Sequence, residues 1–84
     1  MTINPDFIFR KEFDNTGILL NSVDNKVFYL NAISVVIFEL IQQGCDKAQI
    51  LEGLGKRVRN LPPQASQDVD SLIEQLKKIG VLQD

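Results

Sequence analysis

Two periodicities divide the chain near Asn31. Before that residue, apolar and polar side chains follow one another with a repeat close to two in three short runs, DFIFRKEF, GILLNS and KVFYLN, at residues 6–13, 17–22 and 26–31. A repeat of two is typical of β-strands, because successive side chains point to opposite faces. Turn residues separate the runs, and they favour tight connections with a positive φ at Gly17. The pattern predicts an antiparallel meander of three strands.

The first and third runs differ in how they divide their apolar residues. In the first run, Phe7, Phe9 and Phe13 are predicted to share one face, and polar residues take the other. In KVFYLN, two large side chains fall on each face, so neither face is plainly meant for water. The third strand therefore poses the question of what covers its second face.

After Asn31 the apolar repeat lengthens to about 3.6 residues, which predicts helices. Asn31 is a good N-cap for a first helix that ends near Gly44. A second helix is predicted to begin after Asp46, with Gln49 at the capping-box position. Its two internal glycines weaken it, so we expect it to fray after Leu54. The stripe of the first helix, which we expect to form the centre of the core, comprises Ile33, Val36, Ile37, Leu40 and Ile41, with Val35 and Phe38 beside them.

A third helix is predicted from about Ser66 to Gly80, followed by a tucked tail of Val81 and Leu82. Its apolar stripe comprises Val69, Leu72, Ile73, Leu76 and Ile79. The resulting order is three strands and then three helices. We therefore predict one α+β domain over residues 1–84, winged-helix-like, with a three-stranded antiparallel sheet followed by three helices.

Composition and charge exclude several functions. The chain has no histidine and a single cysteine, Cys45, so the commonest general base is missing and no thiol protease or zinc site is predicted. We expect no enzyme activity, no metal and no cofactor. The net charge of -2 and the absence of a long apolar run predict no membrane partner. These features, together with the lone cysteine, predict a small cytoplasmic protein.

The winged-helix order raises the alternative of a DNA-binding regulator. A recognition helix presents basic or amide side chains to the bases, and carboxylates repel the phosphates. The predicted third helix instead carries Asp68, Asp70 and Glu74, and the small basic cluster Lys56, Arg57 and Arg59 follows the second helix. We therefore predict no nucleic-acid partner and keep the regulator as an alternative.

The third strand lies at an edge of the meander if strand order follows the chain. Edge strands usually carry charge, proline or a bulge that blocks further pairing, and Val27 to Leu30 contain none of these. One explanation is that the helices cover the strand, and another is a homodimer joined through it. The third is that an extended peptide adds to the sheet there, in a groove between this strand and the third helix.

The order and spacing of residues along nearly the whole chain, from about Phe7 to Leu82, resemble the PqqD-like family. The residues that carry the resemblance are Tyr29-Leu30-Asn31, Phe38-Glu39-Leu40, Gly44, Ile50, Leu54, Asp68-Val69, Leu72, Leu76 and Gly80-Val81-Leu82. The family fold is three strands followed by three helices. Its members recognise precursors of ribosomally made, post-translationally modified peptides. The resemblance implies that a leader segment binds against the third strand and that the precursor is delivered to a modifying enzyme, often a radical enzyme that uses S-adenosylmethionine.

These observations together predict a stand-alone peptide-binding chaperone. Which of Phe28 and Tyr29 faces the groove depends on the phase of the pleat, which the sequence leaves open. On the third helix we expect Val69, Ile73 and Leu76 to form the wall of the groove, with Leu72 in the core. The predicted peptide-binding residues are Lys26, Val27, Phe28, Tyr29, Leu30, Val69, Ile73, Leu76 and Lys77.

Overall fold

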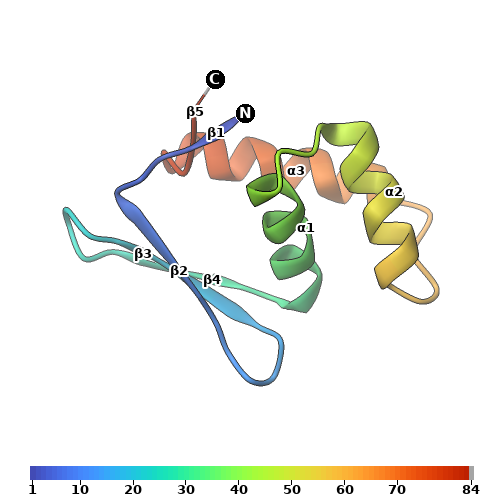
Figure 1. The fold of residues 1–84 in the computed structure, drawn as a ribbon, viewed down its shortest axis with the longest axis horizontal. Coiled ribbons are helices and arrows are strands. Elements are labelled where there is room, and N and C mark those ends of the chain that lie inside the picture. The colour runs from blue at the N-terminus through green and yellow to red at the C-terminus, as the bar shows by residue number, and fades with distance from the viewer. Residues whose placement is uncertain (84) are drawn as a thin grey trace.

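The strands and helices follow one another in the predicted order. The computed structural model describes residues 1–83, in which the six main elements are β2 (Phe7–Lys11), β3 (Gly17–Asn21), β4 (Val27–Leu30), α1 (Ala32–Gln42), α2 (Lys47–Arg57) and α3 (Ala65–Lys78) (Figure 1). The strands form an antiparallel sheet in the order β2-β3-β4. The fold is therefore the predicted α+β arrangement.

The chain ends add a second small sheet that the sequence analysis missed. Strand β1 (Thr2–Ile3) pairs antiparallel with β5 (Leu82–Gln83), which places the two termini close together (Figure 1). Asn4 extends the pairing, since its N–H donates to the Val81 carbonyl at 2.8 Å. The tail predicted after α3 is thus buried as expected, and strand pairing holds it in place. Two-residue strands carry too few positions to show a repeat of two.

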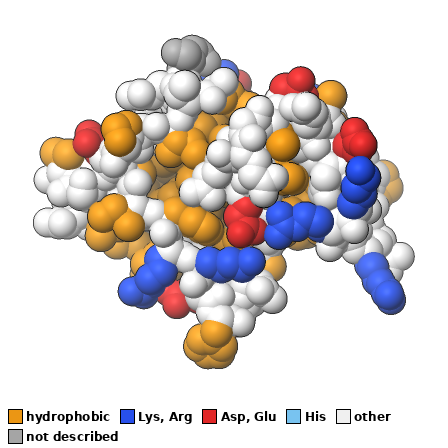
Figure 2. All heavy atoms as spheres, viewed as in Figure 1, with side chains coloured by type: hydrophobic (Ala, Val, Ile, Leu, Met, Phe, Trp, Pro, Cys, Tyr) orange, Lys and Arg blue, Asp and Glu red, His pale blue; other side chains and the backbone are white. Residues whose placement is uncertain are grey.

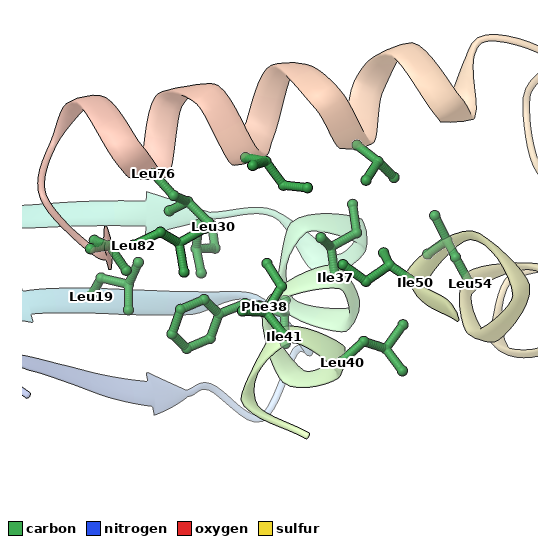
Figure 3. Close-up of a cluster of buried hydrophobic side chains, with 14 of the residues drawn as sticks. Leu19, Leu30, Ile37, Phe38, Leu40, Ile41, Ile50, Leu54, Leu76 and Leu82 are labelled. Carbon is green, nitrogen blue, oxygen red and sulfur yellow. The ribbon is translucent and has the colours of Figure 1, made fainter. Parts of the chain in front are cut away.

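The core lies between the inner face of the sheet and the three helices. Its centre is α1, as predicted: Phe38 is 1% exposed, and its ring centroid lies 4.9 Å from that of Phe9 in β2. Leu76 of α3 and Leu30 of β4 lie next to each other where the core borders the space between this helix and this strand (Figure 3). The other fully buried large side chains are Leu19, Ile37, Ile50, Leu54, Val35, Val69 and Val81.

Local side-chain bonds explain where the first two helices begin. The Asn31 side chain accepts from the Ser34 N–H at 2.8 Å, as predicted for an N-cap. Asp46 and Gln49 form the predicted capping box, each side chain accepting from the other's N–H at 2.9 Å. Helix α2 then continues to Arg57, so the predicted fraying after Leu54 is not observed.

Phe13 corrects the prediction for the first strand. Strand β2 ends at Lys11, and Glu12 donates its N–H to the Thr16 carbonyl at 2.8 Å. This bond closes the hairpin before the third phenylalanine is reached. Phe13 therefore lies on the turn and is fully exposed, although its position in the alternating pattern matched Phe7 and Phe9.

Gly17 is required for a different reason than the one predicted. Its φ is not positive, and the left-handed residue of this turn is Asn15, with a φ of 70°. A Cβ atom at Gly17 would lie 2.9 Å from side-chain carbons of both Phe9 and Val35. Glycine at this position therefore lets the sheet approach α1 closely.

Candidate functional site

Hydrogen bonding at the β3–β4 hairpin shows which residues of β4 bond to β3 through their main-chain groups. Asn21 donates its N–H to the Lys26 carbonyl at 2.9 Å, so these residues are a hydrogen-bonded pair. Such pairs alternate with non-bonded pairs along an antiparallel ladder. Phe28 and Leu30, two and four residues beyond Lys26, therefore bond to β3 through their main-chain groups.

Val27 and Tyr29 consequently direct their N–H and C=O groups away from β3. Strand β4 has no partner on that side among residues 1–83, because the sheet ends with it. Two N–H groups and two carbonyls thus lie along an open edge, where another strand can bond to them. The expectation that the third strand is an unprotected edge is confirmed in this geometry.

A groove runs between β4 and the C-terminal half of α3. Its volume is about 450 Å³. Phe28 and Leu30 turn their side chains towards it from the strand, and Leu72 faces it from the helix. The full lining is Leu19, Val27, Phe28, Tyr29, Leu30, Asn31, Ser34, Leu72, Gln75, Leu76 and Ile79.

The lining of this groove contains no Asp, Glu, Lys or Arg. Its polar groups are the side chains of Asn31, Ser34 and Gln75 and the Tyr29 hydroxyl, with the open edge of β4 beside them. Asn31 already uses its side-chain oxygen to cap α1. An apolar groove beside free main-chain donors and acceptors suits an extended, uncharged peptide segment.

Four of the predicted binding residues from the third strand meet at this site. Val27, Phe28, Tyr29 and Leu30 all line it, with Phe28 and Leu30 on the inner face and Val27 and Tyr29 on the outer face. This resolves the pleat phase that the sequence left open: Phe28, and not Tyr29, faces α3. Leu76 also lines the groove, as its floor, and is 1% exposed.

The helical wall differs from the predicted one. Val69 is fully buried and Ile73 is 8% exposed, and neither lines the groove. Leu72, assigned to the core from the sequence, is half-buried and lines the groove with Gln75 and Ile79. The apolar stripe of α3 is wide, so its central residues face the core and its edge faces β4. A helical repeat identifies such a stripe without showing which edge meets the strand.

The two predicted lysines lie outside the groove. Lys26 precedes β4, and its N–H donates to the Asp24 side chain at 2.9 Å while its carbonyl accepts from Asn21. Its main-chain groups are therefore not available to a peptide. Lys77 lies at a separate shallow hollow on α3, with Glu74 and Lys78.

A second hollow, of about 370 Å³, is basic. Lys11, Arg57 and Arg59 line it over an aliphatic floor. Glu39 lies between two of these cations: its carboxylate is 3.0 Å from the Arg57 guanidinium and 3.6 Å from the Lys11 amine. Figure 2 shows blue and red side chains next to one another and no wide basic surface on this side. The hollow lies apart from the β4 groove and shares no residue with it.

We therefore expect no useful binding of duplex DNA. Affinity for a duplex depends mainly on neutralising phosphates, and here Glu39 compensates part of a small basic cluster while α3 exposes Asp68, Asp70 and Glu74. Fluorescence anisotropy with a labelled duplex at physiological salt measures this directly. A sub-micromolar dissociation constant would contradict the expectation and favour the regulator.

Reactive chemistry is sparse in the part of the chain that the structure describes. Within residues 1–83 no three His, Cys, Asp or Glu side chains gather as a metal-binding group. The Thr16 hydroxyl donates to the Asp14 carboxylate and lowers the pKa of that exposed carboxyl, with the Thr16 N–H adding to the effect. This turn lies outside the groove. No helix of the described residues is long and apolar enough to cross a membrane.

Comparisons with known proteins agree with this fold. A family model described as coenzyme PQQ synthesis protein D (PqqD) matches residues 16–82. The chain is also similar to a solved structure described as TbiB1 in complex with the TbiA(beta) leader peptide, with a TM-score of 0.84 and 19% sequence identity, covering 99% of this chain and 95% of that one. At this identity the likeness shows a shared fold. No curated protein matches the chain.

Proposed function

Since the chain belongs to the PqqD family, we propose that it is a peptide chaperone that binds the leader segment of a ribosomally made precursor and delivers the precursor to a modifying enzyme. The leader adds as a strand at the open edge of β4 and fills the groove beside α3. A radical enzyme that uses S-adenosylmethionine is the class of partner expected. The protein itself performs no catalysis in this scheme.

The observation that carries the proposal is that a free strand edge lies beside an uncharged groove. Val27 and Tyr29 offer main-chain bonds that do not depend on the peptide's side chains, and these provide affinity. Phe28, Leu30 and Leu72 offer apolar contacts that select among sequences. The solved structure with the same fold is a complex with a leader peptide, which supports the same use of the fold here.

A proline at Val27 tests the strand addition. Proline lacks the N–H, and its ring occupies the edge where the added strand must approach. The β3–β4 bonds are spared, because Val27 does not bond to β3. We expect Val27→Pro to stay folded and to bind the leader at least tenfold more weakly, a loss of about 1.4 kcal/mol. The probe is a fluorescein-labelled leader from a precursor encoded beside this chain's gene, and the readout is anisotropy.

The matched control is Lys11→Pro, which removes an outward N–H from β2 at the opposite edge of the same sheet. It should bind the leader as the parent does, and circular dichroism should show both variants folded. Amide shifts on titration should concentrate in residues 27–30 and 72–79. Parental affinity in a folded Val27→Pro, or shifts confined to Lys11 and residues 57–59, would contradict the proposal.

A second copy of the chain competes for the same edge in principle, as the homodimer alternative requires. Sedimentation with and without leader separates the two occupants. Strand addition by a peptide predicts that the leader binds a monomer. A dimer that the leader cannot dissociate would favour the homodimer.

A further inference from the structure

The outer face of the sheet is apolar and open. Ile8, Leu20 and Val27 stand in register across the three strands, and Ile18 and Tyr29 stand in register in the next row. Ile8 is 54% exposed, Val27 41% and Tyr29 83%, so no segment of residues 1–83 covers their side chains. A sheet face that meets water is normally polar, and the part of this apolar patch next to the open edge, at Val27 and Tyr29, marks an interaction surface.

The charged side chains of this face come from β2 and the turn that follows it. Arg10 stands opposite Ile18 on β2, and its guanidinium bonds to Glu12 at 2.9 Å. Neither Val27 nor Tyr29 has a charged neighbour within its own strand. The outward-facing residues of β4 itself are therefore uncharged as well as exposed.

A hollow of about 540 Å³ also opens beside Tyr29. Ile18, Thr16 and Leu30 line it, and Glu12 contributes to its wall. The hollow is distinct from the groove in the direction of α3, although Tyr29, Leu30 and Asn31 contribute to both. A side chain that projects outward from a strand next to β4 has a place to pack here.

Any strand added to β4 must place alternate side chains on the two faces of the sheet. Residues of one parity enter the groove beside α3, and residues of the other parity stand next to Val27 and Tyr29, within about 5.5 Å between directly opposed Cβ atoms. We propose that the bound leader segment is apolar at both parities over about four residues, the length of β4, and that Tyr29 and Val27 select the outward-facing side chains. This inference rests on the proposed function.

The cost of desolvation decides which outward-facing side chains of the leader are disfavoured. An acidic leader residue opposite Val27 or Tyr29 would lose water to aliphatic and aromatic neighbours without gaining a partner. A cationic residue would lose the same water, and Glu12, which lines the hollow, already accepts a bond from Arg10. Glu12 at the wall of the hollow makes a carboxylate there still less favourable. An aromatic or β-branched residue instead gains a cross-strand contact. The leader side chains are thus expected to meet apolar neighbours on both faces of the sheet.

The test is a selection from a phage-displayed library of random ten-residue peptides against three immobilised proteins: the parent, Tyr29→Lys and Ile8→Lys. Ile8→Lys is the matched control, since it adds the same charge to the same face but on β2, about 10 Å from β4 at the usual strand spacing. With the parent we expect enriched peptides to contain an apolar window at both parities. Tyr29→Lys should enrich acidic residues at least tenfold at positions of one parity and leave the other parity apolar. Ile8→Lys should select as the parent does.

Two different failures can be told apart. If the parent enriches peptides that are apolar at one parity and accept any residue at the other, and Tyr29→Lys changes nothing, the leader is read from the groove alone and the inference is wrong while the proposed function stands. If the parent enriches no peptides above blank beads, or if the enriched peptides shift amides outside residues 27–30 and 72–79, strand addition at β4 is wrong and the inference fails with it.

Discussion

Replacing Phe38 with alanine should lower the free energy of unfolding by about 3–5 kcal/mol, the usual cost of removing a buried phenylalanine. Phe38 is 1% exposed at the centre of α1, and it contacts Phe9 across the interface between helix and sheet. The loss combines the transfer energy of the ring with the cavity it leaves. A small domain has about 5–15 kcal/mol of stability in total, so much of it would be lost.

Urea unfolding followed by circular dichroism measures this change, and Phe13 provides the control. Phe13→Ala deletes the same atoms from a side chain that is fully exposed on the β2–β3 turn, and it should change stability by no more than about 0.5 kcal/mol. A loss below about 1 kcal/mol in Phe38→Ala would show that α1 is not the centre of the core.

Aspartate substitutions along α3 should separate the core from the groove wall. Val69 has no exposed surface, so Val69→Asp buries a carboxylate with no partner, at a cost of several kcal/mol. We expect this variant to lose its cooperative unfolding transition. Leu72 is half-buried and lines the groove. Leu72→Asp should therefore stay folded, and its affinity for the leader should fall at least tenfold, about 1.4 kcal/mol.

Ser71→Asp is the matched control for this series, because it adds the same charge one residue away on an exposed face of α3. It should keep both the stability and the affinity of the parent. If Leu72→Asp binds the leader normally, α3 does not form the wall of the groove. If Val69→Asp keeps a cooperative unfolding transition, Val69 does not lie in the core.

Much of the fold follows from short-range signals in the sequence. The polar side chain of Asn31 and the Asp46–Gln49 pair fix where α1 and α2 begin, because they bond to main-chain N–H groups three residues away. Gly44 and Gly80 take positive φ values of 86° and 89° just beyond α1 and α3. These devices act within one turn of helix, so their effect can be read without the tertiary structure.

Several features of the site depend on contacts between distant segments. KVFYLN is apolar on both faces, so no polar contrast indicates which side of β4 faces the helices. The hairpin bond between Asn21 and Lys26 decides which residues of β4 bond to β3, and the packing of the helices on one face of the sheet places Phe28 inside and Tyr29 outside. The same bond decides that Val27 and Tyr29 hold the free main-chain groups of the edge.

The sequence by itself determined the element order, the helix caps, the uncharged edge strand and the family resemblance, because each is carried by local chemistry or by the order of residues along the chain. The way α3 packs against the sheet was decided only by the tertiary structure. That packing buries Val69 and Ile73 and leaves Leu72 at the groove beside β4. The apolar stripe of α3 is wide enough to face both the core and the groove, and the residues of both follow the same helical repeat. Only the position of the neighbouring strand decides which of them each residue faces.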